Sequence, residues 1–215
     1  MKTLITGSSG MVGSLVLNAC LASHNITEVI SFVRKASNKK HPKLNEIIVN
    51  NFEDYTEYSH HFHNVTAAFF CIGVYTGQVA DNIFKRITVN YATSFGKTLS
   101  ENSPKARLCL LSGAGADPTE KSRTSFARYK GMAENQLKQL DLEFYSLRPA
   151  YIYPSIPREE PNMMYRVSKW LYPLIKCLGN KYSITSQQLA YAMFKIGTEG
   201  TQKSILENDD LLAIS

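Results

Sequence analysis

The sequence predicts an α/β fold in which helices cover both faces of a doubly wound parallel sheet. Two observations lead to this prediction. Short apolar runs alternate with amphipathic stretches along most of the chain, as they do in repeated βαβ units. The run at 66–72 is apolar at nearly every position, which is expected of a parallel strand that is buried on both faces. The length of 215 residues gives such a fold a sizeable core.

The expected strands and helices alternate in the order that a parallel sheet requires. Apolar runs of strand length and amphipathic stretches of helical periodicity can be told apart by their spacing. The strands are expected at residues 2–6, 29–33, 47–49, 66–72, 107–112 and 142–147, and the helices at 11–22, 80–100 and 123–140.

A glycine-rich turn lies between the first expected strand and the first expected helix. Gly7, Gly10 and Gly13 are spaced as GxxGxxG. Glycines in such a strand–turn–helix unit allow a tight turn, a close approach of the backbone to a pyrophosphate, and close packing of helix on strand. The phosphates then lie at the helix N-terminus, against free N–H groups and the positive end of the dipole. The motif and its context therefore predict a bound dinucleotide.

The residues after the second expected strand bear on which dinucleotide binds. An acidic residue usually holds the ribose 2′-hydroxyl of NAD at this point, and the sequence has Arg34 and Lys35 there instead. A guanidinium can pair with a 2′-phosphate. We therefore expect NADP(H) as the cofactor and leave NAD(H) open; a solvated surface arginine is the alternative interpretation of Arg34.

The pattern changes after residue 150. Three prolines interrupt an irregular segment, and residues 163–178 then carry apolar side chains at helical spacing, with a break at Pro173. We expect residues 1–215 to form a single NAD(P)-binding domain of the Rossmann type. Residues 154–185 would form a small C-terminal cap or lid over the open end of the sheet.

The last part of the chain is expected to form a short strand at 184–185, an N-cap at Ser186 and a helix at 187–196. Four large side chains of the expected cap indicate an apolar substrate pocket, although they could equally form the core of a cap helix. These are Met163, Met164, Trp170 and Tyr172.

Five segments of the sequence together carry a family resemblance. They are TGSSGMVG at 6–13, FCIG at 70–73, LSGAGAD at 111–117, YKGMAE at 129–134 and LRPA at 147–150. In this combination the chain resembles the atypical branch of the short-chain dehydrogenase/reductase superfamily. Within that branch it is most similar to the Tat-interacting-protein-type oxidoreductases and their bacterial NAD(P)-binding relatives, and the similarity runs nearly end to end.

The resemblance implies a set of cofactor-binding residues. The glycine turn would hold the pyrophosphate, the second strand the 2′-phosphate, the third the adenine, the fourth the ribose and the sixth the nicotinamide, with Lys130 on the ribose. In that order the residues are Gly7, Ser9, Gly10, Met11, Val12 and Gly13; Arg34 and Lys35; Asn51 and Phe52; Cys71, Ile72 and Gly73; and Pro149, Ala150 and Tyr151.

The superfamily's catalytic serine, tyrosine and lysine are only partly matched. Ser112 fits the serine that orients a substrate carbonyl, although it could also make only local hydrogen bonds, and Lys130 fits the lysine. The tyrosine belongs four residues before the lysine, on the same helix face, and Phe126 stands there. A phenyl ring cannot transfer a proton. Changing Phe126 to tyrosine is expected to restore part of the activity.

Three tyrosines are candidates for the missing proton donor. Tyr129 is the nearest, but it is displaced from position 126 by about 4.5 Å along the helix and about 60° around it. It could equally serve packing or substrate contact. Tyr151 and Tyr153, after the sixth expected strand, are about as plausible as Tyr129.

Two functions remain open at this point. The first is an NADP(H)-dependent oxidoreductase that acts on a small carbonyl compound with an altered proton donor. The second is a non-catalytic NADP(H)-binding protein that regulates or senses redox state. The sequence identifies neither the small-molecule substrate nor the oligomeric state.

Charge and composition disfavour several other functions. The formal net charge is +6, but the basic residues are dispersed, so we expect no specific nucleic-acid partner. No apolar run approaches the roughly 20 residues that a membrane span needs, and the N-terminal segment lacks a signal peptide pattern, so a cytoplasmic location is expected. The dense basic cluster, which a cofactor phosphate would explain, is Arg34, Lys35, Lys39, Lys40 and Lys43.

The cysteines and histidines do not have the spacing of metal ligands. The four cysteines are scattered without a CxxC pair, and we interpret them as reduced, buried thiols. His60, His61 and His63 are taken as solvated residues at a helix end. No metal site is expected.

Overall fold

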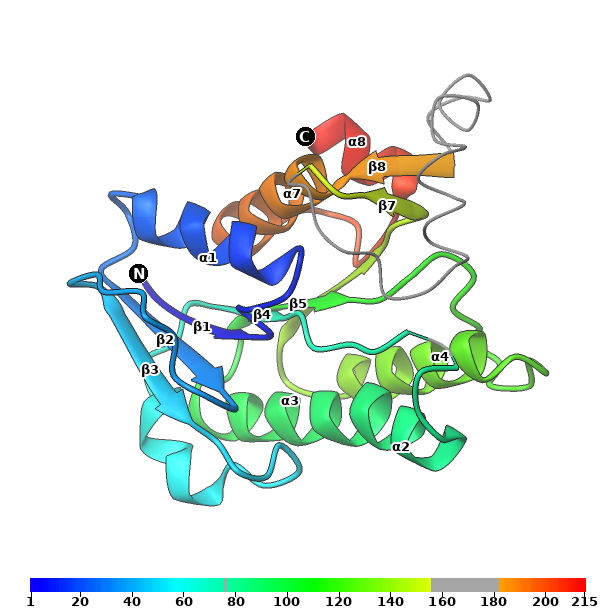
Figure 1. Cartoon of the computed structure of the whole chain (residues 1–215), viewed down its shortest axis with the longest axis horizontal. Coiled ribbons are helices and arrows are strands. Elements are labelled where there is room, and N and C mark those ends of the chain that lie inside the picture. The colour runs from blue at the N-terminus through cyan, green and yellow to red at the C-terminus, as the bar shows by residue number, and fades with distance from the viewer. Residues whose placement is uncertain (76, 156–181) are drawn as a thin grey trace.

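The computed structural model describes residues 1–75, 77–155 and 182–215. At its centre is a parallel sheet of seven strands in the order β3-β2-β1-β4-β5-β6-β9 (Figure 1). The chain runs outward from β1 to β3 on one side and from β4 to β9 on the other. The strands are β1 (Lys2–Thr6), β2 (Glu28–Val33), β3 (Leu44–Ile48), β4 (Ala67–Phe70), β5 (Arg107–Leu111), β6 (Glu143–Arg148) and β9 (Ile205–Glu207).

Helices cover both faces of the sheet (Figure 1). Side chains alternate between the two faces along each strand, so Ile5 and Phe69 pack under one helical layer while Leu4 and Phe70 pack under the other. This confirms the predicted doubly wound, Rossmann-like fold. One layer holds α1 (Gly13–Ala22), α7 (Ser186–Glu199) and α8 (Asn208–Ile214); the other holds α2 (Asp81–Lys85), a π-helical segment (Arg86–Asn90), α3 (Tyr91–Asn102) and α4 (Ser125–Lys138).

Several predicted boundaries were wrong. The third strand is Leu44–Ile48 in place of the expected 47–49, because Leu44, Asn45 and Glu46 also pair with β2 although none of them is buried. The fourth strand, β4, is shorter than the expected 66–72. The helix expected at 80–100 is broken into α2, the π-helical segment and α3. A 3-10 helix at Thr56–Phe62 has His60 and His61 in its last turn and His63 as its C-cap, at the helix end expected there.

The C-terminal part of the chain contributes more to the sheet than a cap would. Helix α7 packs against α1 on the sheet face, and β9 pairs in parallel with β6 as the seventh strand. Strand β9 is only three residues long, which is too short for a periodic pattern to reveal. Strand β8 (Ser183–Thr185), at the end of the expected cap, pairs in parallel with β7 (Tyr151–Tyr153), just before the expected cap, as a second, two-stranded sheet. The expected helix at 163–178, with its four large side chains, lies outside the described residues.

The predicted N-cap of the last long helix was wrong by one residue. Helix α7 begins at Ser186, and Thr185 is its N-cap. The Thr185 hydroxyl accepts a hydrogen bond from the Gln188 backbone N–H at 3.2 Å, and the Gln188 side chain accepts one from the Thr185 backbone N–H at 3.2 Å. This is a capping box. The Ser186 hydroxyl instead accepts from the Ser155 backbone N–H at 3.0 Å.

We expect Thr185→Ala to lower the free energy of unfolding by about 1 kcal/mol, because the first turn of α7 loses a hydrogen-bond acceptor for its N–H groups. Gln187→Ala is the matched control on the same turn, since the Gln187 side chain is exposed, and it should change stability by less than about 0.5 kcal/mol. Urea unfolding followed by circular dichroism measures both. Equal losses in the two variants would contradict the capping role.

Candidate functional site

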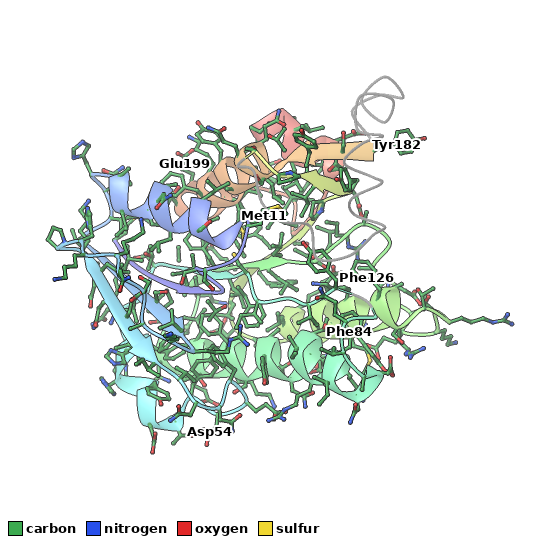
Figure 2. The ribbon with its side chains drawn as sticks, viewed as in Figure 1. Met11, Asp54, Phe84, Phe126, Tyr182 and Glu199 are labelled. Atoms are coloured by element: carbon green, nitrogen blue, oxygen red, sulfur yellow. The ribbon has the colours of Figure 1, made fainter. Side chains whose placement is uncertain are left out.

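A cavity of about 360 Å³ lies at the carboxyl edge of the sheet. It is bounded by the glycine turn after β1 and by the residues that follow β4, β5 and β6, together with part of α4. In sheets of this kind ligands bind where the strand order reverses, and here that point is between β1 and β4. Met11 before α1 and Phe126 on α4, which stand on the two sides of the sheet (Figure 2), both line the cavity.

The glycine turn packs directly on the chain that leaves β4. Gly7 has φ of 72°, and a Cβ there would lie 2.6 Å from the carbonyl carbon and oxygen of Cys71. A Cβ on Gly13 would lie 2.2 Å from the Gly7 oxygen. Neither position has room for a side chain. The turn therefore brings the N-terminus of α1, whose first N–H groups lack intrahelical acceptors, to the cavity.

Most of the predicted cofactor residues come together in the cavity lining. The turn, the segments after β4 and β6, and the catalytic candidates on β5 and α4 all contribute. The residues that line it are Gly10, Met11, Val12, Cys71, Ile72, Gly73, Ser112, Lys130, Pro149, Ala150 and Tyr151.

Other predicted residues lie outside the lining. Ser9 is exposed on the turn, while Arg34, Lys35 and Asn51 are exposed beyond the ends of β2 and β3. Phe52 is a core residue, with its ring 5.7 Å from that of Tyr91. Its ring is therefore occupied by packing.

The basic cluster divides into two groups. Lys39 donates to the Asn18 side chain at 3.0 Å, and Lys43 donates to the Ser23 carbonyl at 2.7 Å, beyond the end of α1. These two lysines hold α1 in place. In the described part of the chain no hydrogen bond or ion pair engages the side chains of Arg34 or Lys35, so these charges face solvent at the carboxyl edge.

A buried carboxylate, Glu134, lies beneath the cavity. It accepts hydrogen bonds from the hydroxyls of Ser112 at 2.5 Å and Ser146 at 2.7 Å, and it forms an ion pair with Arg148. Arg148 also reaches the exposed Glu207 on β9 at 3.0 Å. Hydrogen bonding to Glu134 raises the pKa of Arg148 further above its ordinary value. The network joins α4, β5, β6 and β9.

This network changes the interpretation of Ser112. A serine hydroxyl can donate one hydrogen bond, and the Ser112 hydroxyl donates it to the Glu134 carboxylate. Ser112 lines the cavity, but only its oxygen lone pairs remain available there. It can accept a hydrogen bond from a ligand and cannot at the same time donate one to a carbonyl.

Lys130 projects from α4 into the same cavity, where its ammonium donates to the Leu111 carbonyl at 2.9 Å. Burial lowers the pKa of Lys130 to about 8, and the negative charge of Glu134, one turn further along, partly opposes this shift. The amine therefore loses its proton at a lower pH than an exposed lysine does.

The Phe126 ring points its tip at Gly113. A Cβ on Gly113 would lie 2.5 Å from Cζ of Phe126 and 3.3 and 3.5 Å from the two Cε atoms. These distances place Gly113 along the axis of the ring, beyond its para carbon. A para-hydroxyl would overlap Gly113 in this orientation, which argues against a simple restoration of activity by tyrosine at 126.

Tyr129 faces away from the cavity. It is buried against Phe84, and its hydroxyl donates to the Asp81 carboxylate. The Arg128 guanidinium lies 4.9 Å from the centre of its ring. Hydrogen bonds from Ser125 and Tyr129 hold the pKa of Asp81 below its usual value. Tyr129 thus links α4 to α2 and does not line the cavity; the other two candidates, Tyr151 and Tyr153, lie on β7, and Tyr151 does line it.

Sequence reasoning missed Glu134, Gly113 and Tyr75. Tyr75 lines the cavity after β4, and no local pattern marks it. Glu134 was visible only as the last residue of YKGMAE at 129–134; its position one turn after Lys130 was the available signal, but its burial depends on β5 and β6.

The remaining cysteine and metal predictions can be placed as well. Cys20, Cys71 and Cys109 are free thiols, and burial raises the pKa of each, that of Cys20 to about 12. Cys177 lies outside the described residues. In the ranges that are described, no three His, Cys, Asp or Glu side chains gather as a metal site would require. Within the same ranges no helix has the length and apolarity to cross a membrane.

The sequence from residue 7 to residue 196 matches the model of a family described as NAD(P)H-binding. The chain belongs to this NAD(P)H-binding family. None of the curated protein sequences compared matches the chain.

Solved structures share the fold of this family member at low identity. WbmG from Bordetella bronchiseptica in complex with NAD is 18% identical, with a TM-score of 0.67 over 95% of this chain and 71% of that one. A short chain dehydrogenase from Burkholderia cenocepacia in complex with NADP is 15% identical, with a TM-score of 0.68 over 96% and 87%. The oxidoreductase ylbE from Lactococcus lactis is 15% identical, with a TM-score of 0.68 over 100% and 96%.

The residues present fit the family's dinucleotide. Gly10, which lines the cavity, has no side chain to keep a pyrophosphate away from the backbone of the turn, and the start of α1 offers N–H groups and a positive dipole end. The protein thus has the fold of an NAD(P)H-binding oxidoreductase-like protein.

The Glu134 network should be a major source of stability. We expect Glu134→Gln to cost about 3 kcal/mol of unfolding free energy, because breaking a buried ion pair leaves a charge without compensation. This is the lower end of the usual range, since Arg148 keeps Glu207. Glu207→Gln, at the exposed end, should cost less than about 1 kcal/mol. Similar losses in the two variants, measured by urea unfolding, would disprove the central role of Glu134.

We expect Phe126→Tyr to destabilise the protein by about 1–3 kcal/mol, because the added hydroxyl overpacks the contact with Gly113. Phe126→Leu places no atom at the para position and is the comparison, with an expected cost below about 1.5 kcal/mol. Thermal unfolding of both variants tests the geometry. A tyrosine variant as stable as wild type would show that the ring turns away from Gly113.

Proposed function

We propose that the protein is an NADP(H)-dependent oxidoreductase of the atypical short-chain dehydrogenase/reductase type, akin to the Tat-interacting-protein-type enzymes, and that it reduces a small carbonyl compound. One observation carries the proposal. The N-terminus of α1, the residues after β4 and β6, and Lys130 surround a single cavity at the reversal of strand order. The matched family supports the cofactor class.

In this proposal the chain holds the cofactor from both sides of the sheet. The glycine turn and the start of α1 bind the pyrophosphate. Pro149, Ala150 and Tyr151 flank the nicotinamide, and Cys71, Ile72 and Gly73 pass the ribose. When bound, the nicotinamide supplies the hydride that reduces the substrate. Lys130 faces the same space as the reacting groups.

Arg34 and Lys35 support NADP(H) over NAD(H). Their charges are exposed at the carboxyl end of β2. Two other lysines of the basic cluster, Lys39 and Lys43, donate hydrogen bonds to α1 and to the turn that follows it. An arginine fork is suited to a phosphate monoester. The known complexes of similar fold hold NAD in one protein and NADP in another, so the preference rests on this chain's own residues.

The cavity walls favour an apolar substrate. Val74, Leu111 and Phe126, which are not among the residues assigned to the cofactor, contribute apolar side chains to its lining. Side chains of this kind exclude water from the reacting centre and bind a hydrocarbon body, while a few polar groups set the orientation. A small aldehyde, ketone or quinone fits this description.

The second candidate is a non-catalytic NADP(H)-binding regulator or redox sensor. The observation that favours it is that the hydroxyls of Ser112 and Tyr129 donate their hydrogen bonds to Glu134 and Asp81. In addition, a phenyl ring stands at position 126, where the superfamily has its tyrosine. NADPH binding without oxidation in the presence of carbonyl compounds would support this candidate instead.

NADPH should bind more tightly than NADH, and Arg34→Ala should remove most of the difference. Losing a charge-assisted contact with the 2′-phosphate costs on the order of 1.5–3 kcal/mol, which corresponds to roughly ten- to hundredfold in Kd. NADH affinity should stay unchanged. Fluorescence titration of both nucleotides gives the values.

Lys105→Ala is the control for net charge, because Lys105 pairs with Asp141 just before β5, at the opposite edge of the sheet. It should leave both affinities as they are. If wild type binds the two nucleotides equally, or if Arg34→Ala has no effect on NADPH, the assignment of Arg34 is wrong.

A further inference from the structure

Lys130 carries the only cationic side chain in the cavity lining, as far as the described residues show. Its ammonium has three protons, and its hydrogen bond to the Leu111 carbonyl at 2.9 Å uses one of them. Glu134 makes its hydrogen bonds to Ser112, Ser146 and Arg148. The lysine is therefore held at the end of β5 with protons left for a ligand.

The two side chains expected to handle a carbonyl oxygen are unsuited to it here. The Ser112 hydroxyl already donates its hydrogen bond to the Glu134 carboxylate, and the phenyl ring of Phe126 has no acidic proton. An ammonium combines both functions, because its charge stabilises the oxyanion that develops during hydride transfer and its proton can neutralise it. Tyr75 and Tyr151 also line the cavity, but a neutral phenol lacks the charge.

We propose that Lys130 is itself the general acid of the reduction, donating a proton from its ammonium to the carbonyl oxygen of an apolar aldehyde or ketone. The inference rests on the proposed function. Bound NADPH would supply the hydride for the new C–H bond; as the carbonyl π pair moves to oxygen, an N–H bond of Lys130 breaks and the O–H bond forms. The products are the alcohol, NADP⁺ and a neutral amine, which regains its proton from water.

The surroundings of Lys130 suit this role. An efficient acid titrates near the operating pH, and burial brings the pKa of Lys130 to about 8. Glu134 on α4 is the charged group that opposes the shift. The other titratable groups of the cavity lining are Cys71 after β4, Tyr75 in the following segment and Tyr151 on β7, and Arg148 on β6 faces Glu134.

The test measures single-turnover oxidation of NADPH by benzaldehyde and by ethyl acetoacetate, from about pH 6 to about pH 10, at saturating cofactor. Fluorescence titration of NADPH for each variant separates binding from proton transfer. Wild-type reduction should be constant below pH of about 8, where the amine is protonated, and should fall above it. Oxidation of the corresponding alcohols should show the opposite profile, because it needs the neutral amine.

Lys130→Met and Lys130→Arg should each slow reduction about 10²–10⁴-fold at saturating NADPH and remove the inflection. The arginine variant keeps the charge but cannot release its proton at these pH values, so it distinguishes proton donation from electrostatic positioning. If Lys130→Arg does not fold, the pH profile of wild-type reduction and the rate of Lys130→Met still test the role of Lys130. Lys138→Met, exposed near the end of the same helix, should behave as wild type.

The outcomes separate this inference from the proposed function. Full activity of Lys130→Arg, an inflection that persists in Lys130→Met, or one that disappears in Tyr75→Phe or Tyr151→Phe would overturn the role of Lys130 and leave the reductase in place. NADPH binding with no reduction by wild type would overturn the reductase, and the role of Lys130 with it.

Discussion

The hydrogen bonds of the buried Glu134 carboxylate hold together the half of the molecule that carries the proposed chemistry. Glu134 accepts hydrogen bonds from the residue that follows β5 and from two residues of β6. Its partner Arg148 also forms an ion pair with Glu207 on β9. A charge in such a place is costly unless it is fully paired. The pairing therefore fixes α4 against the strands, and with α4 it fixes the position of Lys130 on the cavity wall.

The other half of the cavity depends on a backbone contact. Because Gly7 touches the carbonyl of Cys71, the turn before α1 and the segment after β4 are held at one distance. The helix N-terminus and the ribose-side residues thus share one wall. In the proposed function, phosphate binding and proton chemistry depend on two separate constraints. One is the backbone packing of Gly7 on Cys71 at the strand-order reversal, and the other is the buried charge of Glu134 beside β5 and β6.

The parts of the structure that could be predicted are those whose cause is local. The first strand, the glycine turn and the first helix follow from residues close in sequence, and the buried runs at 29–33 and 107–112 show their strands by composition alone. Strand β9 could not be predicted, because three residues become a strand only when β6 offers an edge. Thr185 was missed for a different reason: its pairing with Gln188 was readable as a capping box, but Ser186 is an equally good N-cap residue by type.

The site shows the same division between local and long-range causes. The spacing of Lys130 and position 126 along a helix predicted a shared face, and both residues do line the cavity. No local pattern could show that the Ser112 hydroxyl donates its hydrogen bond to the carboxylate of Glu134, 22 positions away. Nor could it show that Tyr129 turns toward Asp81, 48 positions earlier. Hydrogen bonds between distant elements decide which hydroxyls face a ligand.

Position 126 and Lys130 lie one turn apart on α4 and both line the cavity. The Phe126 ring lies against Gly113 and adds a hydrocarbon surface to the wall that Lys130 shares. Burial is the larger of the two causes that set the pKa of Lys130 at about 8, and Phe126, one turn earlier on α4, adds an apolar side chain to the same lining. A phenyl ring has no acidic proton, so in the proposed reduction the proton must come from another group. A lysine whose pKa lies below the ordinary value releases its proton more readily than an exposed lysine, which suits Lys130 to that role.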